Sequence, residues 1–167
     1  MHRKGEFEMK VKHTLVEWED RFVIGIPIVD KQHQRLVELT NDLYLACLQN
    51  TETANRRFME ALHEAVEYVR YHFSTEEKMM LLLEFPDYVT HKKEHESFIL
   101  EILAQTKKFT IKNHLVPNRF VHYLKEWILS HIALCDKAMA DFFLHTKYHE
   151  KLVHLFPRSA KLPAAGK

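Results

Sequence analysis

The fold is decided by residues 72–95, which read HFSTEEKMMLLLEFPDYVTHKKEH. Two pairs of metal-ligand residue types in this stretch are each spaced four apart: His72 with Glu76, and His91 with His95. Residues four apart lie on one face of an α-helix, one turn from each other. Each pair can therefore present two donor atoms to one metal or to two adjacent metals. The stretch predicts two helices, separated by a proline-containing break, that face a common metal site.

The rest of the chain has few residues that interrupt helices. Among its 167 residues only three are glycine, and none of these lies between residues 26 and 165. Glycine and proline end regular elements, and the segments between them are rich in Leu, Glu, Lys, Met and Ala, without the alternation typical of strands. The sequence predicts an all-α fold, an antiparallel up-down-up-down four-helix bundle with an N-terminal arm. The expected helices cover about 27–49, 53–84, 86–112 and 119–146.

The chain is expected to form one domain. Residues 1–26 should form an arm packed on the bundle, residues 27–146 the bundle itself, and residues 147–167 a C-terminal extension that is partly disordered. Within the bundle, residues 113–118, which include Pro117, should separate the last two helices.

Composition excludes several classes of partner. The formal net charge of +1 at pH 7 gives no reason to expect a nucleic acid or an anionic membrane. No apolar run is long enough to span a bilayer, and the first residues lack the apolar segment of a signal peptide. Two cysteines, Cys47 and Cys135, cannot form a disulfide framework and are typical of a reduced cytosolic protein. We expect a soluble, cytoplasmic chain.

Each expected helix carries histidine within its apolar stripe. The stripe of the second helix, for example, alternates steps of four and three and reads Phe58, Leu62, Ala65, Val69, His72, Glu76, Met79 and Leu83. Over all four helices the inward histidines are His33, His72, His91, His95 and His131. A buried imidazole needs a partner for its polar nitrogens. One alone is usually a satisfied core residue, whereas five that face one core indicate a metal site.

With Glu76 and Asp136 the set has seven donors, which is too many for one tetrahedral zinc. It suits two metals that share the two carboxylates, because imidazole binds iron, copper, zinc and nickel and a carboxylate suits a bridging role. With both carboxylates and a solvent-derived oxygen as bridges, each metal has three shared ligands. Three histidines then complete six-coordination at one metal, and two leave the other with an open position for a small molecule.

Four motifs resemble those of the hemerythrin family in its bacterial single-domain form. They are DKQH at 30–33, HFSTEE at 72–77, HKKEH at 91–95, and WILSHI at 127–132 followed by Asp136. The similarity extends from about Trp18 to Phe143. It implies a four-helix bundle with a non-haem di-iron centre that binds O2 reversibly. The cofactor would be two Fe ions bridged by Glu76, Asp136 and an oxo or hydroxo group.

The resemblance also implies a role for each histidine. His91, His95 and His131 would hold the iron that is coordinatively saturated, and His33 and His72 the iron with the open position. Neutral imidazoles add no negative charge and should disfavour the high-valent iron that O–O cleavage needs. Di-iron oxygenases and ferritin-like sites are instead rich in carboxylates, with two Glu-x-x-His pairs on separate helices.

Four apolar residues beside the expected ligands are candidates for the lining of an O2 pocket: Leu36, Phe73, Ile128 and Ile132. Leu36 lies one turn beyond the histidine of the first helix, and the others flank or precede ligands. A dry lining would slow the loss of bound oxygen to water. Each of the four, taken singly, is at least as well explained as ordinary core.

His131 and Asp136 are five residues apart, about 140° around an ideal helix, and Cys135 is the residue that shares the face of His131. A one-residue π-bulge would turn Asp136 inward, and such bulges occur often at functional sites. We therefore expect a bulge there, with Cys135 as a ligand the competing interpretation. Beyond it, the inward stripe should continue through Ala138 and Phe142.

Three polar residues near the ligands are expected to lie outside the site. His63 and His122 each precede a ligand by nine residues, which is half a turn in projection, and should face solvent. Glu77, next to Glu76, should belong to a solvated face.

The expected function is reversible O2 binding for storage, delivery or buffering, without enzymatic activity. O2 is the ligand, and an oxygen-consuming enzyme is a candidate partner. Three alternatives remain open: an O2 or redox sensor that acts through a partner, a di-iron enzyme that handles peroxide or nitric oxide, and a structural bundle without metal.

Overall fold

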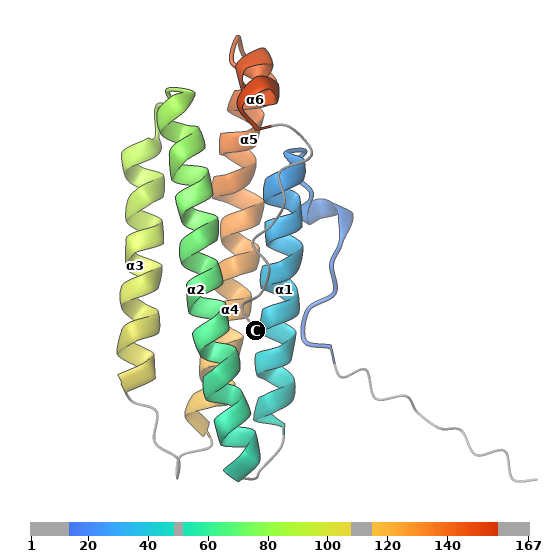
Figure 1. Cartoon of the computed structure of the whole chain (residues 1–167), viewed down its shortest axis with the longest axis vertical. Helices are drawn as coiled ribbons and strands as arrows, with labels where there is room; N and C mark the ends of the chain where they lie inside the picture. Colours follow the sequence, from blue (N-terminus) through green and yellow to red (C-terminus); the bar gives the residue numbers. More distant parts are fainter. Residues whose placement is uncertain (1–13, 49–51, 108–114, 157–167) are drawn as a thin grey trace, which may run out of the picture.

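A computed structural model describes residues 14–48, 52–107 and 115–156. Within these ranges, four long helices run alongside one another in alternating directions (Figure 1). The helices are α1 (Pro27–Cys47), α2 (Glu52–Leu82), α3 (Tyr88–Lys107) and α4 (Leu115–His131). The prediction of an all-α antiparallel four-helix bundle is confirmed.

The fourth helix extends beyond α4 through two further elements on the same path (Figure 1). The first is η2 (Ile132–Asp136), a single turn of π-helix, which we call the π-turn. The second is a short helix, α5 (Lys137–Leu144). The first helix packs against both α2 and α4. This arrangement encloses a core between the four helices. The middle of each helix lies at about the same level along the length of the bundle (Figure 1).

The apolar periodicity of the second helix is confirmed by its burial. All eight positions of the predicted stripe, from Phe58 to Leu83, are buried. Burying an aliphatic or aromatic side chain of this size contributes about 1.5–3 kcal/mol, so the stripe fixes which face of α2 points inward. That face carries His72 and Glu76 into the core.

The fourth helix begins earlier than predicted. Residues 113–118 were expected to separate two helices, but α4 begins at Leu115. Pro117 therefore lies in the first turn, where backbone N–H groups have no partner within the helix, so a proline there removes no helical hydrogen bond. The predicted end of the third helix, beyond Lys107, lies outside the described residues.

A short helix that the sequence interpretation missed, α6 (His149–Leu155), follows α5. Its Leu152 is buried, and the Lys151 ammonium donates a hydrogen bond to the carbonyl of Leu82 at 2.6 Å. The Tyr148 hydroxyl donates to Glu84 at 2.6 Å. The first part of the predicted C-terminal extension thus packs on the end of α2, and residues 157–167 lie outside the described part of the chain.

Residues 14–26 precede α1 and pack along it. The backbone N–H groups of Leu15 and Val16 both donate to the side-chain oxygen of Asn41 at 3.0 Å. Gly25 has φ +86°, a backbone conformation that favours glycine. This turn lets the N–H groups of Ile24 and Gly25 donate to the Asp30 carboxylate at 2.8 and 3.2 Å. These hydrogen bonds tie the segment before α1 to the first turn of the helix, where a negative charge is favourable. The predicted arm residues 1–13 lie outside the described residues.

Over the described ranges of the chain, no helix has the combination of length and hydropathy that a membrane span requires.

Candidate metal centre

Seven polar side chains meet at one depth in the bundle, although they come from distant parts of the chain. None of the seven is more than 4% exposed. They are the predicted donors: His33 on α1, His72 and Glu76 on α2, His91 and His95 on α3, His131 on α4, and Asp136 in η2.

Glu76 lies at the centre of one set of contacts. Its Oε2 is 3.5 Å from Nε2 of His72 and 3.3 Å from Nε2 of His95. Its Oε1 is 3.8 Å from Nε2 of His33. The i, i+4 spacing on α2 places His72 and Glu76 on one face, as expected, and the neighbouring helices supply the other imidazoles.

Asp136 lies at the centre of a second set. Its Oδ1 is 3.2 Å from Nε2 of both His91 and His131, and its Oδ2 is 3.2 Å from Nε2 of His33. The carboxylate reaches these rings because η2 is a π-turn, and the predicted bulge is confirmed. Cys135 is half-buried and belongs to neither group of donor atoms described next.

The donor atoms form two overlapping groups, within each of which all atoms lie within 4.8 Å of one another. The larger group consists of Glu76, His91, His95, His131 and Asp136. The smaller group consists of His33, His72, Glu76 and Asp136. Both carboxylates belong to both groups, so the arrangement has the form of two adjacent metal positions with shared carboxylates.

The chemistry of the centre fits cations. In the described part of the chain, both ring nitrogens of His33 and all four carboxylate oxygens of Glu76 and Asp136 are buried without a hydrogen-bond partner. Nε2 of His131 also lies 3.1 Å from Nε2 of His91 and of His95. Buried polar atoms without partners are costly. Metal ions among them would satisfy the carboxylates and the imidazole lone pairs together.

The pKa values of the same groups describe a buried site with two persistent negative charges. Burial opposes ionisation of Asp136, but the facing rings of His131, His33 and His91 hold its pKa well below the usual value. Burial and the charge of Asp136 likewise oppose ionisation of Glu76, yet contacts with imidazoles lower its pKa to about 2. Both carboxylates are therefore charged at neutral pH, which favours a cationic occupant.

The imidazoles respond to the same charges in different directions. Burial disfavours the protonated ring of His33, but Asp136 and Glu76 outweigh it and raise its pKa to about 9. His131, beside Asp136, has its pKa raised to about 10 against the effect of burial. Burial dominates at His72 and lowers its pKa to about 4. A neutral ring is the form that binds metal.

Two side chains hold ligand-type histidines from outside the centre, and the sequence interpretation missed both. Gln32 Oε1 accepts a hydrogen bond from Nδ1 of His72 at 3.2 Å. Glu77 Oε1 accepts one from Nδ1 of His95 at 3.3 Å. The expectation that Glu77 belongs to a solvated face is therefore wrong: it is 22% exposed and points toward α3, because α3 lies beside that face of α2.

Aromatic rings pack flat against two of the histidines. Phe73 stacks on His95 with ring centroids 3.7 Å apart and planes 3° from parallel. Trp127 stacks on His131 at 4.3 Å and 14°. These contacts restrict ring rotation and keep water from the faces of the imidazoles.

A small apolar cavity of about 10 Å³ adjoins the centre. Its lining includes His72, His131 and Asp136. The structure brings all four residues predicted for the O2 pocket together in the rest of its lining: Leu36, Phe73, Ile128 and Ile132. Their role in binding O2 stays a prediction.

The π-turn also changes which residues of α5 face inward. Ala138 was expected on the inward stripe, but it is exposed, and Met139, Ala140 and Phe143 are buried instead. The extra residue in η2 rotates everything after it by one position. Phe142 is only half-buried for the same reason.

The histidines expected outside the site are indeed exposed. His63 and His122 both lie on the outer surface of their helices, as predicted from their half-turn offset. Five inward histidines are thus distinguished from outward ones by their positions in the stripe.

Comparison with known proteins agrees with the geometry. The family model of the hemerythrin HHE cation binding domain matches residues 24–143. The chain is 32% identical to a bacteriohemerythrin of Stenotrophomonas maltophilia over 128 residues, which cover 77% of this chain and 81% of the relative. It is 29% identical to a bacteriohemerythrin of Clostridium acetobutylicum over 127 residues, 74% of this chain and 98% of the relative. A hemerythrin-like protein of Naegleria gruberi is 29% identical over 119 residues, 71% of this chain and 86% of the relative.

Proposed function

Because this chain belongs to the hemerythrin family, we propose that it binds O2 reversibly at a non-haem di-iron centre. Its role would be to store, deliver or buffer O2, with an oxygen-consuming enzyme as the partner that benefits. The iron pair supplies the electrons that O2 takes up on binding and returns on release. The residues of the chain hold the irons, leave one position open and exclude water.

The observation that carries the proposal is that Glu76 and Asp136 belong to both groups of donor atoms. In the proposed arrangement these two carboxylates bridge the irons, together with an oxo or hydroxo group. His91, His95 and His131 would complete the coordination of one iron. His33 and His72 would leave the other iron with one open coordination position. O2 would bind on that side, where the apolar cavity touches His72.

Two properties of the chain favour O2 binding over oxidation chemistry. Five imidazoles and two carboxylates are less anionic than the carboxylate-rich sites of di-iron oxygenases. The lining of the adjoining cavity is mostly apolar. Such a lining would exclude water and protect a reactive complex from side reactions. In this proposal the chain has no catalytic residue.

Location in the cytoplasm is part of the same proposal. Cys47 and Cys135 are both free thiols, the state that a reducing compartment maintains.

The proposal is tested by anaerobic loading with ferrous iron, followed by exposure to air. We expect two irons per chain and a coloured adduct that bleaches when O2 is removed and returns when O2 is restored. His72→Ala should lose the adduct, whereas His63→Ala, an exposed histidine on the same helix, should keep it. A colour that forms once and never reverses would point to a di-iron enzyme and against an O2 carrier.

A further inference from the structure

One imidazole in each of the two donor groups is hydrogen-bonded through the ring nitrogen that faces away from the centre. His72, in the smaller group, has Gln32 as its partner, and His95, in the larger group, has Glu77. The two partners differ in charge, since one is a neutral amide and the other a carboxylate. Such partners of a ligand set the orientation, tautomer and basicity of the ring.

The direction of the Gln32 hydrogen bond follows from its other contacts. The Thr75 hydroxyl donates to the carbonyl of Tyr71 at 3.0 Å, so its oxygen accepts from the Gln32 amide nitrogen at 3.1 Å. The amide oxygen of Gln32 then faces His72, and Nδ1 of His72 must carry the proton. Nε2 of His72 is left with a free lone pair that points at the centre.

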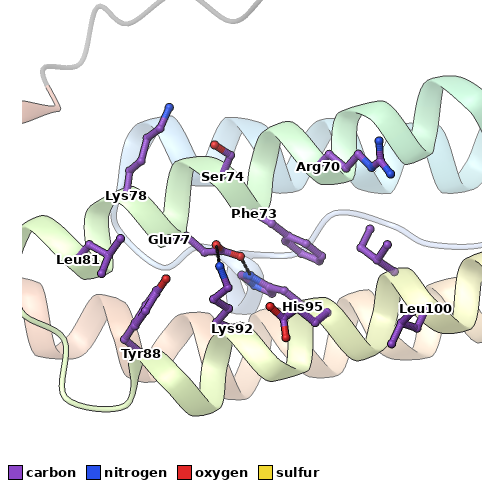
Figure 2. A pocket seen from close by; sticks show the side chains of 12 residues that line it. Arg70, Phe73, Ser74, Glu77, Lys78, Leu81, Tyr88, Lys92, His95 and Leu100 are labelled. Carbon is purple, nitrogen blue, oxygen red and sulfur yellow. Dashed lines mark hydrogen bonds and ion pairs between the residues drawn. The ribbon is translucent and has the colours of Figure 1, made fainter.

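Glu77 fixes His95 in the same tautomer. A carboxylate only accepts hydrogen bonds, so Nδ1 of His95 must be the donor. The other oxygen of Glu77 accepts from the Lys92 ammonium at 3.1 Å. Figure 2 shows that both contacts of Glu77 are made by residues of α3. All three residues line a groove of about 640 Å³ between α2 and α3. A series of hydrogen bonds from His95 through Glu77 to Lys92 therefore runs from the centre to the surface.

We propose that Gln32 and Glu77 are positioning residues that hold His72 and His95 with Nε2 toward the metals, and that the carboxylate makes the larger donor group bind its iron first. The inference rests on the proposed di-iron function and deepens it. A carboxylate partner raises the basicity of an imidazole more than an amide does. The five-donor position thus has the stronger ligand set, and the two irons load in sequence.

The test combines two measurements on each variant. The first is an anaerobic titration of metal-free protein with ferrous iron against a competing chelator. Glu77→Ala should lower the affinity for the first iron about ten- to a hundredfold, and Gln32→Ala should lower the affinity for the second iron by a similar factor. Glu77→Gln should keep the fold and hydrogen bond but narrow the gap between the two affinities. Glu96→Gln, an exposed glutamate that lines the same groove, is the matched control and should change neither affinity.

The second measurement is the tautomer of each ring in the metal-free protein, from nitrogen-15 NMR of the imidazoles at about pH 8. We expect Nδ1–H for His72 and His95, and loss of that preference in Gln32→Ala and Glu77→Ala respectively. The proposal would be overturned if Gln32→Ala and Glu77→Ala, like the control, kept the iron affinities and the tautomers of the natural chain. If the natural chain binds no iron at all, the proposed function fails, while the tautomers still decide whether the two hydrogen bonds position the rings.

Discussion

Nε2 of His131 and Oδ1 of Asp136 lie 3.2 Å apart, although the two residues are five positions apart on a helix that should turn them to different sides. The π-turn η2 supplies the missing rotation. A π-turn accommodates one extra residue in a helix, and it places residue i+5 close to the face of residue i. The helix that carries the last histidine thereby also delivers a shared carboxylate.

Asp136 and Cys135 are neighbours that should respond oppositely to substitution. Asp136→Asn removes a negative charge from both donor groups, so we expect fewer than two irons per chain and no reversible O2 adduct. Cys135→Ala should leave iron content and adduct unchanged, since the thiol lies outside both groups. Iron content after gel filtration checks both. Loss of iron in Cys135→Ala would revive the interpretation that the thiol is a ligand.

The π-turn can be removed without turning Asp136 away. Deleting Ala133, an exposed residue of η2, should convert the turn to a regular α-helix in which the aspartate follows His131 by four residues. The deletion variant should fold and bind two irons.

The matched control is deletion of Ala138, an exposed residue of the regular helix α5. It rotates the buried residues Met139 and Phe143 out of the core and should lower Tm strongly. Thermal unfolding and iron content distinguish the two. Equal damage from both deletions would contradict the geometric role of the turn.

The apolar cavity should protect the O2 complex. Ile128→Thr keeps the branch at the β-carbon but makes the side chain one heavy atom shorter and adds a hydroxyl to the lining. Because the hydroxyl stabilises water beside the centre, we expect autoxidation to be roughly tenfold faster, a change of ~1.4 kcal/mol in the barrier. The rate is measured as loss of the adduct in air. An unchanged rate with unchanged iron content would mean that this residue is ordinary core.

Phe98 should be a main anchor of α3. It is 1% exposed and stacks on Trp127 with ring centroids 3.8 Å apart. Phe98→Ala should cost about 3–5 kcal/mol of unfolding free energy, because it leaves a cavity in the core. Leu100→Ala, on the exposed side of the same helix at 67% exposure, should change it by less than about 0.5 kcal/mol. Denaturant unfolding of the metal-free protein measures both.

The inward direction of each helix was predictable from spacing. Polar residues such as His72 and Glu76 occupy positions of an apolar stripe, and a stripe with period 3.6 has only one inward direction. The same reasoning predicted the π-turn, because Asp136 fell off the stripe while remaining a required donor. It failed just beyond, at Ala138, because the stripe was continued without the rotation that the turn introduces.

The partners Gln32 and Glu77 show why the rest could not be predicted. Each lies one position away from a donor, about 100° around its helix. In a bundle that direction leads to a neighbouring helix and not to solvent, and which neighbour lies there depends on packing. Periodicity within one helix carries no information on that choice. The short helix α6 was missed for a related reason, since a helix of so few residues depends on its contacts with α5 and with the end of α2.

The most direct test of the di-iron centre is a crystal structure of the anaerobically iron-loaded protein, with anomalous diffraction at the iron edge. We predict two iron peaks inside the bundle, both in contact with Glu76 and Asp136. One should also contact three histidines from α3 and α4, and the other the histidines of α1 and α2. A single peak, or iron bound elsewhere without a shared carboxylate, would contradict the account.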